Sequence, residues 1–247
     1  STAVFGRTNG VLISPRLAFS SVLAHEMVHS MNIGHSYSER KRMVFPHGAP
    51  GEYGDRFDLM STANAWMHST RFGWAGPGLA GPHLDYLGWL PHTRMVYFGG
   101  NSSAQVIRLS SLSVPHSTTN GQLLIMIPYD RKEPANVFTV ELRTPHGNDP
   151  AVLIHNVKRV GGAFYSYLIA HKASTDEFTE GTEWMRLIDN GQALVRVQID
   201  RFTSPTEALI LVQSTFDPTR CGRGERSVPV VLSESEKRNG ERQSGKV

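Results

Sequence analysis

Residues 25–29 combine two histidines and a glutamate at the spacing that a metal site needs. His25 and His29 are four positions apart, so on a helix both imidazoles project from one side and can reach a single ion. Glu26 follows the first histidine, where its carboxylate can act on a metal-activated water without binding the metal. The segment predicts a hydrolytic metal centre with Glu26 as the general base.

A third histidine follows six positions after the second. His35 completes a three-ligand set if the chain turns back under the metal, and a fourth position then stays open for water. Asn32 stands where the helix must end, and Asn tolerates a left-handed conformation better than any residue except Gly. We expect Gly34 to add freedom for the reversal. An HExxH string also occurs by chance in helices, so the prediction of a metal site depends largely on the third histidine.

A methionine in a polar turn is the second feature of the possible metal site. Residues 53–61 read YGDRFDLMS, with Met60 near the end of the segment. Taken alone, a methionine after a loop is more often a residue that fills a gap in the core. Glu52, Asp55 and Asp58 are acidic, but their spacing does not match a calcium loop.

Together these two segments resemble the metzincin clan of zinc endopeptidases, whose signature is H-E-x-x-H-x-x-G-x-x-H followed by a Met-turn. Asn32 stands where that signature has glycine. Asn followed by Ile-Gly-His-Ser is similar to the gametolysin group, which are cell-wall-degrading metallopeptidases. The resemblance implies Zn²⁺ held by the three histidines, Glu26 as the catalytic base and Met60 as an apolar floor beneath the metal ligands. It also assigns the three acidic residues before Met60 to a turn.

The resemblance covers roughly residues 10–95. Within it, residues 76–91 are similar to the short helix ending in Leu-Gly-Trp that closes the catalytic domain of this family. We interpret that stretch as a capped helix that packs Leu84, Leu87 and Trp89 on the core, with no chemistry of its own. The resemblance further implies endopeptidase activity on a protein or glycoprotein substrate, and an extracellular or secreted location.

The histidines must be positioned by a helix. Residues 10–14 indicate a strand, and Ser14-Pro15 then offers an N-cap followed by proline at the first helical position, so we expect a helix to start there. Apolar residues follow at helical spacing and would face the core. They are Leu17, Ala24, Val28 and Met31. The two imidazoles would project from an adjacent face.

After Met95 the chain changes to short β-branched and aromatic runs separated by turn signals, which are typical of an antiparallel sandwich. The runs are 95–98, 105–109, 123–128, 137–142, 151–156, 163–170, 193–199 and 208–213. We therefore expect an α+β fold with three parts. These are the C-terminal part of a metzincin-like catalytic domain (1–95), an antiparallel β-rich, sandwich-like module (96–218) and a polar, disordered tail (219–247).

Composition excludes several other classes of protein. The chain has 247 residues, of which 39% are hydrophobic and 19% charged, as in ordinary globular proteins. No apolar run is long enough for a transmembrane helix. The net charge of +3 lies in residues 219–247, where seven basic and four acidic residues interleave, so a nucleic-acid partner is not expected. Cys221 is the one cysteine, which excludes an internal disulfide.

A protein without catalytic activity is the alternative to an enzyme. Only 24 residues precede His25, whereas metzincins carry a mixed sheet there. Residues 3–5 and 11–13 would be its last two strands, including the edge for an extended substrate, and most of the sheet would be missing. A truncated or silent metallopeptidase-like protein, whose β-rich module binds a glycan or protein, is therefore the second hypothesis. A stray helix in an all-β protein is a third. Glu26 favours the enzyme, because a silent protein does not need the base.

Overall fold

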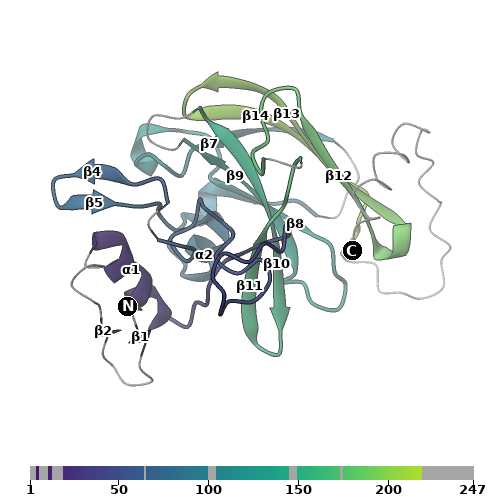
Figure 1. The fold of residues 1–247 in the computed structure, drawn as a ribbon. Coiled ribbons are helices and arrows are strands. Elements are labelled where there is room, and N and C mark those ends of the chain that lie inside the picture. The colour runs from purple at the N-terminus through teal and green to yellow at the C-terminus, as the bar shows by residue number, and fades with distance from the viewer. Residues whose placement is uncertain are drawn as a thin grey trace.

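Strands account for 40% of the chain and helices for 13%, so the protein is mostly β-sheet, as an α+β or β-rich class requires (Figure 1). The expected tail at 219–247, with Cys221, lies outside the described residues. The side chains of residues 4–5 and 11–12 are likewise not described. The computed structural model describes residues 4–5, 11–12, 19–63, 65–99, 104–144, 149–172 and 175–218.

Two β-sheets form the body of the molecule. Their strands are β3 (Tyr37–Ser38), β6 (Met95–Tyr97), β7 (Gln105–Ser110), β8 (Leu124–Pro128), β9 (Val137–Arg143), β10 (Ala151–Val160), β11 (Ala163–Leu168), β12 (Glu183–Ile188), β13 (Ala193–Ser204) and β14 (Glu207–Ser214). One sheet has the order β3-β11-β10-β9-β8-β6, and the other has the order β12-β13-β14-β7. The pairs β3–β11 and β6–β8 are parallel, and the other pairs in these sheets are antiparallel.

The main hydrophobic core lies between these two sheets. Strand β9 shows how the alternation of side chains builds it. Phe138, Val140 and Leu142 belong to this core, together with Trp184 of the facing sheet. The rings of Phe138 and Trp184 meet edge to face, with centroids 4.9 Å apart. The predicted sandwich-like packing is therefore present.

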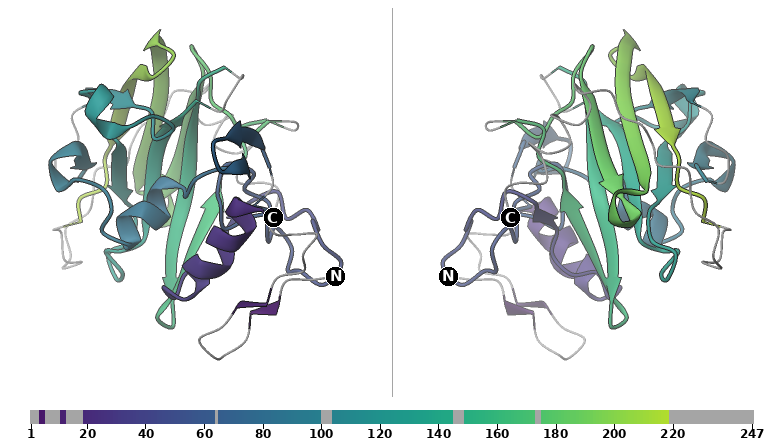
Figure 2. Two further views of the ribbon diagram at one scale, coloured as in Figure 1. Left: turned by 90° about the vertical axis from the view of Figure 1, so that its left-hand side faces the viewer. Right: turned by 90° about the vertical axis from the view of Figure 1, so that its right-hand side faces the viewer.

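The other face of β9 is buried as well, although its residues are polar. Thr139, Glu141 and Arg143 alternate with the apolar residues and are at most 6% exposed. Segments from the first hundred residues cover them. In the side views of Figure 2, the first helix lies on one side of the six-stranded sheet and the four-stranded sheet lies on the other. The six-stranded sheet is thus the middle layer of the molecule.

The first hundred residues contribute short elements and long loops. Helices are α1 (Ser20–His29), α2 (Gly81–Tyr86) and the 3₁₀ turn η2 (His92–Arg94), and later 3₁₀ turns are η3 (His116–Thr118) and η4 (Asp189–Gly191). Two hairpins pair β1 (Val4–Phe5) with β2 (Val11–Leu12) and β4 (His68–Thr70) with β5 (Gly73–Ala75). The second hairpin lies beside the start of α1, where the Ser20 hydroxyl donates to the Trp74 carbonyl at 2.9 Å.

Several expected elements differ from the observed ones. Helix α1 begins at Ser20, because Phe19 is extended, with φ −88° and ψ 150°. The helix therefore does not run continuously from Ser14-Pro15, and residues 13–18 themselves lie outside the described part. Met31 follows the end of the helix and is 40% exposed rather than in the core. Strand β12 was not expected, because charged residues interrupt its apolar pattern.

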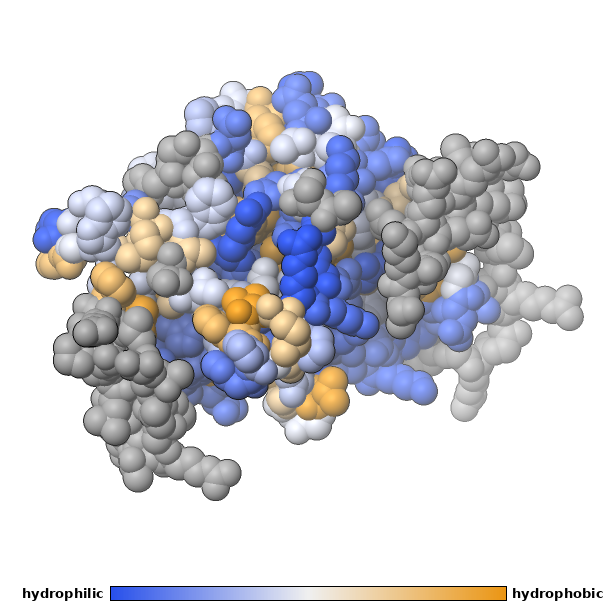
Figure 3. Space-filling view, viewed as in Figure 1, coloured by the Kyte–Doolittle hydropathy of each residue, from blue (hydrophilic) through white to orange (hydrophobic). Residues whose placement is uncertain are grey.

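Within the described residues, none of the helices is long and apolar enough to cross a bilayer. On the face seen in Figure 3, hydrophilic residues predominate, and apolar residues form small separate groups.

Candidate metal centre

Three histidines come together at the end of α1 and in the loop that follows it. The ring centroids of His25 and His29 are 4.7 Å apart. The ring of His35 lies 5.5 Å from the first and 4.8 Å from the second. One nitrogen of each ring lies within 4.8 Å of the other two. The three side chains are therefore close enough to hold one metal ion, as their spacing predicts.

A single left-handed residue reverses the chain between the second and third histidines. Helix α1 ends at His29, and the amide of Asn32 still bonds to the His29 carbonyl at 3.1 Å. Asn32 takes a φ of 62°, which confirms the expected left-handed turn. The expectation for Gly34 was wrong. Gly34 is not left-handed, and a Cβ atom there would meet no atom within 4 Å.

Each of the three imidazoles has an oxygen acceptor at one ring nitrogen. In chain order, the histidine Nδ1 atoms lie 2.7 Å from the Leu59 carbonyl, 2.8 Å from the Ile33 carbonyl and 2.6 Å from Glu52 Oε1. Because these oxygens carry no hydrogen, each Nδ1 must be the donor, and Nε2 then carries the lone pair that binds a metal. The surroundings of the three rings therefore select the tautomer that a metal site needs.

Burial favours the neutral form of two of these rings. It lowers the pKa of His25 to about 4, although the bond to the Leu59 carbonyl acts in the opposite direction, and the neighbouring imidazoles lower the pKa further. Burial also lowers the pKa of His35, against the effect of Glu52. Since a metal ion binds the neutral imidazole, His25 and His35 do not have to lose a proton at neutral pH.

Met60 is a fully buried side chain. It is 0% exposed and packs with Val28 of α1 and Ile33 of the reversal. Its carbonyl accepts the amide hydrogen of Ser36 at 3.0 Å. The preceding carbonyl, of Leu59, accepts the His25 bond. The backbone of the turn around Met60 thus contacts both segments that carry the histidines, helix α1 and the loop with His35.

Glu26 is mostly buried beside the histidines. It is adjacent to His25 on α1 and only 8% exposed. Among the described residues, its carboxylate makes no hydrogen bond or ion pair. A carboxylate that no side chain or backbone group of the described residues occupies, beside three imidazoles that can hold a metal, is placed to act on a bound ligand.

Tyr53 covers the third histidine. Its ring centroid lies 4.0 Å from that of His35, and the two planes are tilted by 40°. The backbone of Tyr53 has a φ of 61°, a conformation that costs a non-glycine residue on the order of 1–3 kcal/mol. Burial raises the pKa of Tyr53 to about 12, and the charges of Glu52 and Glu26 contribute to the shift. The phenol is therefore within electrostatic reach of Glu26.

No family model, curated protein or solved structure matches the chain. Its chemistry must be derived from its own side chains. The structure brings together the three predicted metal ligands, His25, His29 and His35. Glu26 is the neighbour of His25 on α1, and Met60 follows the residue whose carbonyl bonds to His25. Sequence reasoning missed the roles of Glu52 and Tyr53, which lie just before the methionine turn.

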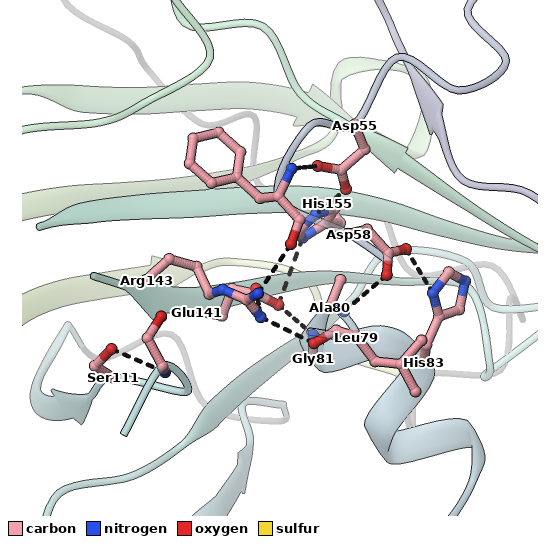
Figure 4. Close-up of polar contacts among 12 residues, drawn as sticks. Asp55, Asp58, Leu79, Ala80, Gly81, His83, Ser111, Glu141, Arg143 and His155 are labelled. Carbon is pink, nitrogen blue, oxygen red and sulfur yellow. Dashed lines mark hydrogen bonds and ion pairs between the residues drawn. The ribbon is translucent and has the colours of Figure 1, made fainter. Parts of the chain in front are cut away.

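The acidic residues before Met60 do more than form a turn, because each of them contacts an imidazole. Two of these contacts join distant parts of the chain and are fully buried (Figure 4). The distances are 2.6 Å, 3.0 Å and 2.6 Å for Glu52–His35, Asp55–His155 and Asp58–His83. The assignment to a turn was therefore incomplete, since it missed the histidine partners.

Asp58 connects the methionine turn to helix α2. Its Oδ1 atom accepts amide hydrogens from Met60 at 3.3 Å and from Ala80 at 3.0 Å. Burial acts to raise the pKa of Asp58, but the adjacent His83 side chain and the two amide bonds outweigh burial and hold the pKa at about 2. The carboxylate is therefore ionised at neutral pH and fixes the turn to the helix.

Strand β9 also holds this turn, through polar residues on its outer face (Figure 4). The two terminal nitrogens of Arg143 donate to the carbonyls of Phe57 and Leu79, both at 2.9 Å. Glu141 accepts the amide hydrogen of Gly81, and its Oε1 lies 3.5 Å from the Arg143 guanidinium. Buried ionisable groups of the sandwich thus hold the backbone on either side of the methionine turn, whose Leu59 carbonyl accepts the His25 bond.

Proposed function

We propose that this chain is a zinc-dependent endopeptidase. The observation that carries the proposal is the convergence of three oriented imidazoles beside an unpaired, nearly buried Glu26. A purely structural metal site has no need of a free carboxylate, because its ligands fill the coordination sphere. Three ligands with one position left for water are typical of a catalytic site instead.

Zinc is the metal that suits these ligands. Three imidazoles that bind through Nε2, each fixed by an oxygen acceptor at Nδ1, form the ligand set of many catalytic zinc sites. Calcium and magnesium prefer oxygen ligands, so neither fits the three nitrogens. Bound zinc would polarise the scissile carbonyl and lower the pKa of the attacking water.

Glu26 would supply the proton transfers. Its carboxylate takes a proton from the water as the oxygen attacks the carbonyl carbon, and it then passes that proton to the amine that leaves. His25, His29 and His35 keep the geometry fixed because their Nδ1 hydrogens are held. The resemblance to metzincins supports a protein or glycoprotein substrate and a secreted location, and both are part of the proposal.

The proposal is tested by metal removal and return. We expect a chain stripped with a chelator to lose cleavage of a quenched fluorescent protein substrate, and one equivalent of Zn²⁺ to restore it. Magnesium at the same concentration serves as the control. If the chain binds one zinc ion but cleaves nothing, it is a silent metallopeptidase-like protein. If it binds no zinc, the assignment of the three histidines is wrong.

Glu52 provides a separate prediction about metal affinity. Replacing Glu52 by Gln should weaken zinc binding by about 10–100-fold, because the carboxylate orients His35 and increases its basicity as a ligand. Competition with a chromophoric chelator measures this change. Glu39→Gln is the matched control, since Glu39 pairs with Arg186 away from the histidines. Equal affinities of the two variants would contradict the role given to Glu52.

A further inference from the structure

A pocket lies on the outer face of the six-stranded sheet, beside helix α2. Its volume is about 190 Å³. Strand pairing places Tyr97, Met126 and Thr139 opposite one another across β6, β8 and β9, and these residues form part of its floor. Residues of α2 and of the β10–β11 hairpin form its walls. None of the residues that line it belongs to α1 or to the loop with His35, so the pocket is separate from the metal centre.

Aromatic rings make up much of this pocket. The rings of Tyr86 on α2 and Phe164 on β11 lie 5.0 Å apart and are tilted by 42°. The Arg159 guanidinium lies over the Tyr86 ring, 5.7 Å from its centroid. Tyr97 belongs to the edge strand β6 and is 50% exposed, so part of its ring is open to a ligand. Aromatic faces of this kind bind the flat, apolar side of a ligand.

Several polar groups that line the pocket make no hydrogen bond among the described residues. Asp85 and Arg159 both line it, yet their side chains form no ion pair and no hydrogen bond there. The hydroxyls of Tyr86 and Tyr97 make none either. The carboxylate only accepts hydrogen bonds, the guanidinium only donates them, and a phenol does both. A ligand that satisfies these groups must therefore carry donors and acceptors together.

The two opposite charges and the small volume restrict the ligand further. A ligand with a net positive charge would meet the Arg159 guanidinium, and one with a net negative charge would meet the Asp85 carboxylate. The pocket is also smaller than the roughly 300–1,000 Å³ of the pockets that take drug-sized ligands. The ligand class that fits is therefore small, uncharged and rich in hydroxyl groups, with one apolar face.

We propose that this pocket binds one sugar ring of a carbohydrate. The C–H face of the ring packs on the aromatic side chains, while its hydroxyl groups donate to Asp85 and accept from Arg159. The site does not depend on the proposed endopeptidase activity, and its ligand needs no zinc. It enables the chain to hold a glycan at a distance from the metal centre.

Direct binding of simple sugars tests this proposal. The full chain is titrated with the methyl glycosides of glucose, galactose, mannose, arabinose and N-acetylglucosamine, and saturation-transfer NMR measures each affinity. We expect at least one glycoside to bind, and Asp85→Ala to weaken it by roughly 10-fold or more, the effect of losing a hydrogen bond to a charged group. Tyr97→Ala should weaken the same glycoside, because it removes an exposed ring. Asp200→Ala is the matched control, since Asp200 is an exposed carboxylate of the four-stranded sheet.

Three outcomes would overturn the proposal. If no glycoside of the panel binds the wild-type chain, the pocket is not a sugar site. Equal affinities of the wild type, Asp85→Ala and Tyr97→Ala would place the sugar elsewhere on the chain. Loss of binding on removal of zinc would place it at the metal centre instead. A chain that binds a glycoside through this pocket but cleaves no peptide would contradict only the endopeptidase proposal.

Discussion

A Glu26→Gln variant is expected to lose peptide hydrolysis by a factor of roughly 10²–10⁴, the contribution of a positioned general base. Glutamine has nearly the same shape, but it cannot accept the proton of the attacking water. The histidines are untouched, so zinc affinity should stay within a few-fold of the wild-type value. Steady-state kinetics on a quenched peptide and a chelator competition would measure the two quantities.

The stability of the same variant provides an internal control. Because the Glu26 carboxylate has no hydrogen-bond or ion-pair partner among the described residues, replacing it with an amide of the same shape breaks no contact and should leave the melting temperature of the zinc-free protein unchanged or raise it slightly. A gain or no change in stability combined with a loss of activity distinguishes a catalytic group from a structural one. A variant that keeps activity within ten-fold of wild type would show that the base is another residue.

An Arg143→Met variant is expected to lose about 3–5 kcal/mol of unfolding free energy, the cost of breaking a buried ionic network. Arg143 is 6% exposed and bonds two carbonyls of the segments below the histidines. Methionine fills part of the space but donates no hydrogen bond, so the Phe57 and Leu79 carbonyls lose their partner and Glu141 loses a neighbouring positive charge. Urea denaturation of the zinc-free protein, by circular dichroism, measures the change.

Arg186→Met is the matched control for this second prediction. Arg186 also lies on a sheet strand and forms an ion pair with Glu39 at 2.9 Å, but both side chains are more than a quarter exposed. Solvent screens such a pair, so we expect a loss of at most about 1 kcal/mol. If both arginine variants lose the same stability, the buried network does not hold the methionine turn in place.

The sequence predicts the cluster of three histidines because the spacing that brings them together lies within a few neighbouring residues. Two histidines one helical turn apart, a third after a residue that tolerates positive φ, and a methionine further on require no knowledge of distant parts of the chain. Most strands after Met95 are also predicted, since their alternation and turn signals are local. The predicted parts are thus those whose partners lie within a few residues or a single turn.

The buried ionic network around Asp55, His155, Glu141 and Arg143 could not be predicted from local sequence patterns. Asp55 pairs with His155 across 100 residues, and neither residue has a spacing that points to the other. Glu141 and Arg143 look like ordinary polar positions of a half-exposed strand, and only the packing of earlier segments on the sheet buries them. Strand β3 is two residues long and pairs in parallel with β11, which no local pattern indicates. Tertiary burial, not local propensity, decides these positions.

The parallel pairing of β3 with β11 affects the order of events during synthesis of the chain. Strand β3 follows His35 directly, yet its partner leaves the ribosome much later, and so do the residues that bind Arg40 just beyond it. Domains fold from the N-terminus as they emerge from the ribosome. The segment with His35 and β3 therefore cannot take its final position until β11 has been synthesised. We therefore expect a nascent chain to lack an ordered third histidine until its sheets are complete.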